Sequence, residues 1–364
     1  MPITIDDLRH FAIARSLCTP TTLKRAIDRL GFVQADPIRA PARAQDLTLR
    51  HRVKDYRAGD LERRYATLDV EEDFFINYGF VPRRIQALMH PRATARWPSA
   101  HGKRVRALLD FVRERGEVHP REVDGHFAHG RVTNYWGGSS AATTHLLDLM
   151  HRRGVLRVAR REGGIRVYAA REHPAGPMDA AGRRERIDAL VDLATSLYAP
   201  LPGRSLPTLV SRLRYAVPQW QHELKGALQR VKERLACARV DGHDWYWPSQ
   251  ERVPRGQPSD MVHLLGPFDP VVWDRRRFEL FWRWAYRFEA YTPAAKRKRG
   301  YYALPLLWRD QVIGWGNLSQ QNGSLHASFG YVESQPSDRL FRRELEAEVE
   351  RVRLFLRLDR HAPA

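Results

Sequence analysis

The chain has 364 residues, and its 61 Lys and Arg against 42 Asp and Glu give a formal net charge of +19. So large a positive charge favours a partner that carries phosphates, either a nucleic acid or an anionic membrane surface. The membrane is disfavoured because the sequence contains no long apolar run. An arginine-rich composition inherited from a GC-rich genome is the alternative explanation. Only two cysteines, Cys18 and Cys237, are present, which excludes a disulfide framework and favours a reducing, cytoplasmic location.

The first hundred residues are expected to form a winged-helix-like unit. Charged residues interrupt the N-terminus, so we expect no signal peptide, and Thr4 predicts the cap of a first helix. The pair Thr19-Pro20 predicts the start of a second helix, and residues 32–35 read as a short strand. Residues 43–56 are predicted to be helical and basic, and residues 60–90 to be mostly helical.

Two further stretches repeat a pattern of three helices followed by a hairpin. In residues 101–175, Ser139 or Ser140 is expected to cap the third helix, and a Gly-Gly turn at 163–164 predicts the hairpin. In residues 176–250, Asp241-Gly242 is the hairpin turn. Three helices followed by a hairpin is the winged helix-turn-helix pattern.

A different domain follows a linker rich in Pro, Ser, Gln and Arg. Residues 260–364 contain three predicted strands, one turn at Asn322-Gly323, and a final amphipathic helix that begins near Asp338. We therefore predict an α+β fold, mainly α, with tandem winged helix-turn-helix units at residues 1–100, 101–175 and 176–250. The C-terminal part, residues 260–364, is predicted to be a small antiparallel, barrel-like β domain.

The candidate catalytic segment is Gln34-Ala35-Asp36-Pro37. On an extended backbone Gln34 and Asp36 point to one face, and Pro37 keeps Asp36 extended. An acid that holds a water, an amide that orients it and nearby arginines suit a hydrolytic site on nucleic acid. Asp-Pro also commonly starts a turn, so a purely structural role for Asp36 stays open.

The segment 31–50 around Gln34-Ala35-Asp36 resembles the start of the YcaQ-like crosslink-repair DNA glycosylases, which are winged helix DNA-binding proteins. Those proteins carry Gln-hydrophobe-Gln or Gln-hydrophobe-Asp at this place, and this sequence resembles the Gln-hydrophobe-Asp branch. The resemblance continues, in order, through residues 266–275, 291–297 and 300–307. Two positions depart from the family pattern: Gln45 stands where members often have His, and Ala35 is smaller than the usual hydrophobe.

The resemblance implies a DNA repair glycosylase with Gln34 and Asp36 as its catalytic residues. Asp36 would polarise a water toward the anomeric carbon or stabilise the oxocarbenium-like charge, while Gln34 orients the water or the sugar. An N7-alkylated guanine leaves as a neutral base and needs no general acid, so one carboxylate is enough, unlike the acid pair of ordinary glycosidases. We therefore predict a monofunctional enzyme for N7-alkylguanine, with interstrand crosslinks left open as a further substrate.

Basic residues in three places are candidates for binding DNA phosphates. The first group follows the catalytic segment, the second lies on the predicted hairpin of the second unit, and the third is the densest basic run in the chain. For the first group a solvated helix face is the alternative. In that order, the candidates are Arg39, Arg43 and Arg50; Arg157, Arg160, Arg161 and Arg166; and Lys296, Arg297, Lys298 and Arg299.

The alternative function is a winged-helix transcriptional regulator that binds DNA without chemistry. The acid at Asp36 discriminates, because a surface that only binds phosphates gains nothing from a carboxylate among arginines. His126 and His129 lack the further ligands of a zinc site, so we expect neither a metal nor a cofactor. We expect a monomer that acts on double-stranded DNA with alkylated bases, is not bound to membranes, and is associated with the nucleoid.

Overall fold

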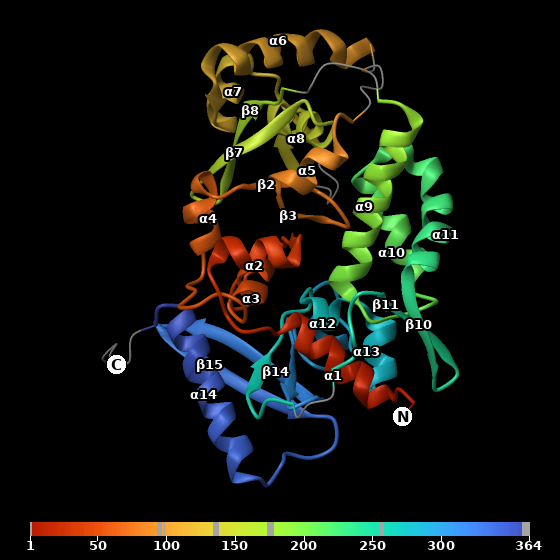
Figure 1. The fold of residues 1–364 in the computed structure, drawn as a ribbon. Coiled ribbons are helices and arrows are strands. Elements are labelled where there is room, and N and C mark those ends of the chain that lie inside the picture. The colour runs from red at the N-terminus through yellow and green to blue at the C-terminus, as the bar shows by residue number, and fades with distance from the viewer. Residues whose placement is uncertain are drawn as a thin grey trace.

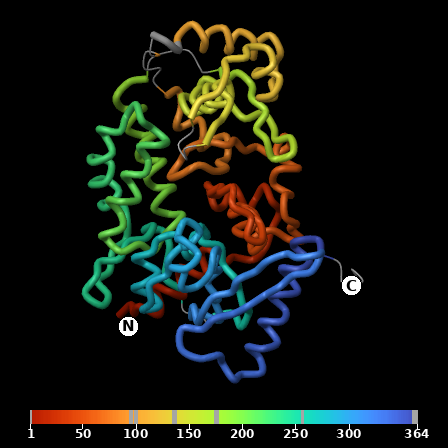
Figure 2. Tube along the Cα trace, turned by 180° about the vertical axis from the view of Figure 1, so that it is seen from behind, coloured from red at the N-terminus to blue at the C-terminus, as the bar shows by residue number. Residues whose placement is uncertain are grey.

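The computed structural model describes residues 2–92, 97, 99–133, 138–172, 178–254 and 258–358. The fold is α+β, with helices and small antiparallel sheets, as predicted. In Figure 1 the segment from α2 to α5 occupies the centre, α6 to β8 lie above it, α9 to α11 run along one side, and α1 lies lower, beside α12 and α13. The C-terminal sheet and α14 form the lower part, as Figure 2 also shows from behind. Whether the units are true winged helices, and where their boundaries lie, stays a prediction.

The N-terminal segment differs most from expectation. A capping box at Thr4 begins the first helix as predicted, but the second helix begins at Leu23, because Thr22 provides its cap and Thr21 pairs with Val53. Residues 60–90 are not mostly helical, since their centre is a β-hairpin. The elements are α1 (Ile5–Ser16), α2 (Leu23–Leu30), β1 (Val33–Gln34), α3 (Ala44–Leu49), α4 (Asp60–Arg64), β2 (Val70–Phe74), β3 (Tyr78–Pro82) and α5 (Arg83–Met89).

The second unit follows the predicted order, with one addition. Ser139 and Ser140 lie in a short strand and do not cap the helix, which begins at Ala142 after Ala141. The hairpin of β7 and β8 turns at Gly163-Gly164. The elements are α6 (Ser99–Arg115), β4 (Glu117–Val118), α7 (Pro120–Phe127), β5 (Arg131–Thr133), β6 (Ser139–Ala141), α8 (Ala142–Arg152), β7 (Leu156–Glu162) and β8 (Ile165–Ala170).

The third unit and its hairpin match the prediction. Asp241 and Gly242 both have positive φ, as a tight two-residue hairpin turn requires. A short extra strand, β9, pairs with the hairpin. The elements are α9 (Ala180–Tyr198), β9 (Leu201–Pro202), α10 (Leu206–Arg212), α11 (Leu224–Arg234), β10 (Leu235–Val240) and β11 (His243–Pro248).

The C-terminal sheet is open, so the barrel-like prediction is wrong. Its four antiparallel strands follow the order β12-β13-β14-β15, and among the described residues the two outer strands do not pair with each other. Helix α14 packs beside β12 and covers part of the sheet. The elements are β12 (Val262–Leu264), α12 (Pro270–Trp273), α13 (Arg275–Trp282), β13 (Leu304–Trp308), β14 (Gln311–Gln321), β15 (Ser324–Tyr331) and α14 (Arg339–Phe355).

Two hydrophobic cores hold these parts together. The larger one runs from α2 through the second and third units to α14. The smaller one joins α1 to α12, α13 and β11, where Phe11 meets Trp247 edge to face with 6.4 Å between ring centroids. Helix α1 therefore packs with the C-terminal part of the chain and not with α2.

Three consecutive buried carboxylates on β2, which we call the β2 carboxylate row, join the N-terminal segment to the second unit. The row is Glu71, Glu72 and Asp73. Glu71 accepts hydrogen bonds from Arg157, and Glu72 accepts two from Arg161, each 2.6 Å long. Buried charges are stable only when paired in this way.

Asp73 completes the row through Arg92. The Arg92 guanidinium lies 2.8 Å from one Asp73 oxygen, and His90 Nε2 lies 2.8 Å from the other. Burial alone would raise the pKa of Asp73, but the charges of Arg92 and His90 outweigh it and lower that pKa well below the usual range. The same guanidinium donates to the carbonyls of Phe74, Arg152 and Ala216, so it links all three units.

We expect Asp73→Ala to lower the free energy of unfolding by about 3–5 kcal/mol, because it leaves the buried Arg92 charge without its partner. Urea denaturation at pH 7 measures the change. The control is Asp69→Ala, which removes one of the two acids that pair with Arg83, in an exposed pair 3.7 Å apart, and should cost about 0–1 kcal/mol. Equal losses in the two variants would contradict the importance of this row.

Candidate active site

The strand that leads to the catalytic segment is short and tightly packed. Helix α2 ends at Gly31, whose positive φ of 69° and close contact with Leu193 leave no room for a side chain. In β1, Gln34 pairs with Gly79 of β3, where an added Cβ would lie 2.3 Å from the Val33 carbonyl oxygen. This close approach requires glycine at position 79 and holds the segment against the β2–β3 hairpin.

Asp36 lies just beyond β1 in a turn of its own. One oxygen of its carboxylate accepts a hydrogen bond from the Ile38 backbone N–H at 2.9 Å, across Pro37. Its backbone N–H donates to the Gln45 side-chain oxygen at 3.4 Å. Gln45 is buried in α3, so the position that departs from the family pattern supports the backbone of Asp36.

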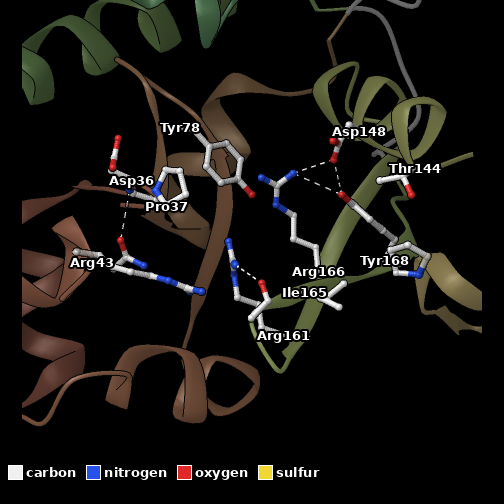
Figure 3. Close-up of a pocket in the computed structure, with 14 residues that line it drawn as sticks. Asp36, Pro37, Arg43, Tyr78, Thr144, Asp148, Arg161, Ile165, Arg166 and Tyr168 are labelled. Carbon is white, nitrogen blue, oxygen red and sulfur yellow. Dashed lines mark hydrogen bonds and ion pairs between the residues drawn. The ribbon is translucent and has the colours of Figure 1, made fainter. Parts of the chain in front are cut away.

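A cleft of about 350 Å³ opens beside Asp36. Figure 3 shows Asp36 and Pro37 on one side of it and the side chains of α8, β7 and β8 on the other, with Tyr78 between them. Its size suits a small ligand. The lining residues are Ala35, Asp36, Pro37, Arg43, Gln45, Tyr78, Pro120, Thr144, Asp148, Arg161, Gly164, Ile165, Arg166 and Tyr168.

Asp36 differs from the other carboxylate in this cleft. Asp148 lies 2.8 Å from the Arg166 guanidinium and accepts a hydrogen bond from Tyr168, whereas Asp36 makes no ion pair with any described residue. In Figure 3 the Asp36 oxygens point away from the guanidinium groups of Arg43 and Arg161. The acid is therefore available to a ligand.

Burial raises the pKa of Asp36 above its ordinary value, and the hydrogen bond from Ile38 offsets only part of this effect. The charge of Asp36 also affects the pKa values of two tyrosines in the C-terminal domain. After burial, which is the main cause, the Asp36 carboxylate contributes to the raised pKa values of Tyr291 and Tyr302. The buried Tyr302 hydroxyl has no hydrogen-bond partner among the described residues. Asp36 therefore lies near Tyr291 and Tyr302 of the C-terminal domain.

Gln34 lines a different cavity. Its side-chain oxygen accepts a hydrogen bond from Trp273 Nε1 at 3.1 Å, and the Trp273 ring stacks on Tyr198 with 4.3 Å between centroids. The cavity at Gln34 has a volume of about 380 Å³, and Asp36 does not line it. The prediction that both side chains share one face assumed a longer strand, but β1 ends at Gln34 and Asp36 belongs to the following turn.

The three arginines near the motif that were predicted to bind phosphate lie in different environments. Arg39 is exposed and pairs with no carboxylate in the part of the chain that the structure describes. Arg43 lines the cleft but pairs with Glu62. The prediction of Arg50 as a phosphate ligand is corrected, because its buried guanidinium pairs with Glu348 and donates to the Leu264 carbonyl.

The arginines of the β7–β8 hairpin are also engaged. Arg157 and Arg161 pair with the β2 carboxylate row, and their role as phosphate ligands stays a prediction. Arg160 is more exposed but pairs with Glu117 and Glu162, and Arg166 pairs with Asp148. Charge patterning along the sequence could not show that acids from distant segments neutralise these arginines.

The basic run at residues 296–299 is partly held by the fold. The backbone N–H groups of Lys298 and Arg299 donate to Glu289, and the Arg299 guanidinium lies 4.9 Å from the Trp284 ring centroid. The Arg297 guanidinium lies over Tyr301 and donates to the Thr292 carbonyl, and Lys296 is exposed. Their role in DNA binding stays a prediction.

Asp269 and Asp274 cap two successive helices. Asp269 caps α12 and also forms a buried ion pair with Arg52, 2.8 Å long, while Asp274 caps α13. Trp273 and Tyr302 were not predicted as site residues. The resemblance of residues 266–275 to the glycosylase family was the sequence signal that could have identified Trp273.

No group of three or more metal-ligand side chains occurs among the described residues. In the same residues, no helix has the length and apolar character needed to cross a membrane.

Two comparisons with known proteins bear on this site. The family model of the AlkZ-like DNA glycosylases matches residues 27–355, which is nearly the whole chain and includes the candidate catalytic segment. The solved structure of the DNA glycosylase AlkZ from Streptomyces sahachiroi is similar to this one with a TM-score of 0.61 and 14% sequence identity. The similarity covers 98% of this chain and 97% of that chain, and at this identity it shows a shared fold alone.

We expect Asp36→Asn to raise the melting temperature at pH 7, because the variant keeps an oxygen for the Ile38 N–H and removes a penalised charge. A raised folded-state pKa means that the ionised acid opposes folding, so the gain should shrink as the pH falls toward that pKa. Glu72→Gln is the control, and we expect it to change the melting temperature in the opposite direction. Although burial alone would raise the pKa of Glu72, the Arg161 contacts lower it, so this variant should melt earlier at pH 7. A lower melting temperature for Asp36→Asn would assign Asp36 a structural role.

Proposed function

We propose, on the premise that this chain belongs to the family of AlkZ-like DNA glycosylases, that it hydrolyses the N-glycosidic bond of N7-alkylguanine in double-stranded DNA. The observation that carries the proposal is the partly buried Asp36 carboxylate, which is held by one backbone N–H and free of any ion pair with a described residue. The family match favours an enzyme over a regulator without chemistry.

The arrangement of the acids suits a leaving group that is already cationic. An N7-alkylated guanine carries a positive charge and departs as a neutral base, so it needs no proton from the enzyme. Asp148 is bound by Arg166 and Tyr168, which leaves Asp36 as the acid that can act. Ordinary glycosidases need two free carboxylates. A crosslink through guanine N7 has the same kind of leaving group, and we include it as a candidate substrate.

In the proposed reaction Asp36 acts on the sugar side of the bond. Its negative charge stabilises the developing oxocarbenium-like cation and orients a water for attack at the anomeric carbon. Water is the proposed nucleophile, since no lysine is among the described residues that line the cleft. This assigns a monofunctional glycosylase.

Gln34 is a positioning residue in this proposal. Its oxygen is occupied by Trp273, and its amide nitrogen makes no hydrogen bond with a described residue. The nitrogen is therefore available to a sugar or phosphate oxygen of the DNA. Together with Trp273 it links the catalytic segment to α12, so substitutions here should change positioning more than chemistry.

We propose further that the protein works as a monomer on chromosomal DNA in the cytoplasm. The charge of +19 supports contact with DNA.

We expect Asp36→Asn to slow single-turnover release of 7-methylguanine by on the order of a hundredfold or more, because it removes the charge that stabilises the transition state. DNA affinity should be unchanged or slightly higher, since a carboxylate repels phosphates. Gln34→Ala should lose less activity than Asp36→Asn.

The matched control is Asp148→Asn, which removes the other acid of the same cleft and should lose far less activity than Asp36→Asn. Each variant is assayed at saturating enzyme beside a binding titration and thermal melting. Undiminished release by a well-folded Asp36→Asn variant would refute the mechanism.

The pH dependence should report the ionised form of Asp36. Because the pKa of Asp36 is raised, the single-turnover rate should fall on acidification with an inflection above pH 3.8. Release without enzyme is subtracted at each pH, and the residual rate of Asp36→Asn should not show this inflection. A rate that rises on acidification would instead indicate that Asp36 donates a proton.

A further inference from the structure

A cationic groove leads away from Gln34 and has no role in the function described so far. It consists of two adjoining cavities, the one of about 380 Å³ at Gln34 and a second of about 410 Å³ beside the β10–β11 turn. Arg204 and Arg276 line both cavities, so the two lie next to each other. Its lining residues come mainly from α10, α12, α13 and the β10–β11 hairpin, which lie near one another in Figure 1.

Three arginines of this groove have no ion-pair partner among the described residues, unlike Arg43, Arg161 and Arg166 of the cleft at Asp36. Arg204, Arg212 and Arg276 are exposed, and none of them forms an ion pair or hydrogen bond with another residue in the described ranges. They come from two parts of the chain, the α10 region and α13, so their approach is a product of the fold. Like charges gathered without acids are costly unless a polyanion binds there.

The acids that line the groove do not neutralise these arginines. Asp274 is buried, and its oxygen accepts the Arg277 backbone N–H at 2.8 Å as the cap of α13. Asp244 lies 2.9 Å from the Arg239 guanidinium. Lys232 adds a further positive charge at the far cavity. The groove therefore stays strongly positive along its length.

We propose that the cationic groove binds the sugar-phosphate backbone of the DNA strand that carries the target base, with Arg204, Arg212 and Arg276 as phosphate ligands. Guanidinium groups bind phosphate oxygens through charge-assisted hydrogen bonds. Trp273 and Phe268, at the Gln34 end, offer apolar surface to a sugar or an unstacked base. The assignment of the target strand rests on the proposed function, whereas DNA binding in the groove does not.

The test is a triple variant, Arg204→Ala with Arg212→Ala and Arg276→Ala, in fluorescence binding titrations with undamaged duplex DNA. Each lost phosphate contact lowers the slope of log affinity against log salt by about 1, so the slope should fall by about 3 and the affinity by at least about tenfold at 100 mM salt. Single-turnover release of 7-methylguanine at saturating enzyme should fall far less than the affinity does.

Two matched variants control for net charge and for geometry. Arg339, Arg342 and Arg343 are exposed on α14, away from α10 and α13 in Figure 1, and their triple replacement by Ala removes the same charge. This control should change the slope by less than 1. Replacing the three groove arginines by Lys keeps the charge and should restore most of the affinity and the slope.

An unchanged slope and affinity in the groove variant, or a loss equal to that of the α14 variant, overturns the proposal. If the Ala variant melts early, the Lys variant decides instead: a folded Lys variant that binds as weakly as the Ala variant excludes a charge contact with phosphates. Failure of the wild-type protein to release 7-methylguanine would refute the proposed function, while the titrations with undamaged DNA would still test the groove.

To assign the target strand, neutral methylphosphonate linkages replace the phosphates next to the 7-methylguanine, on one strand at a time. In the wild type they should weaken binding when placed on the damaged strand, and in the Ala variant they should cost little more, because the same contacts are already lost. Equal losses in both proteins would show that the groove does not contact these phosphates.

Discussion

The β2 carboxylate row is the constraint on which the rest of the structure depends. Glu71, Glu72 and Asp73 are buried at the join between the N-terminal segment and the second unit, and each needs a cation there. Buried carboxylates cannot stay ionised without close partners, so arginines from β7 and from residue 92 must reach them. That pairing holds the β7–β8 hairpin against β2 and β3, and so forms the far wall of the cleft beside Asp36.

This constraint divides the cations of the protein into two groups. The arginines of the β7–β8 hairpin form ion pairs with acids of the protein itself and stabilise the structure. Arg204, Arg212 and Arg276 face a groove without neutralising acids. Asp36 lies just beyond a short strand, where partial burial raises its pKa and no cation among the described residues forms an ion pair with it. Hydrolysis of a glycosidic bond in DNA requires an acid near the sugar and cations near the phosphates.

Local signals in the sequence were reliable where local chemistry decides the structure. The capping box at Thr4, the Asp241-Gly242 turn and the Asp338 cap all appear in the structure, because each depends on hydrogen bonds or φ values within a few residues. The same reasoning failed for residues 60–90. The charged residues of Val70–Phe74 concealed a buried strand. A strand is usually recognised by alternating polar and apolar residues. That alternation is absent here because ion pairs with another unit stabilise charged side chains on both faces of the strand.

The sequence by itself determined the α+β class, most of the helices, the family and the segment that carries Asp36, because these follow from short-range patterns and motif order. The tertiary structure alone decided which charges are free. Arg50 and Arg161 look like any surface arginine in the sequence, yet each is buried against an acid from a distant segment. It also placed Gln34 and Asp36 on different cavities, since a strand of two residues cannot keep its alternation into the next turn. Ion pairing and burial are set by residues far apart in the chain, and no local pattern encodes them.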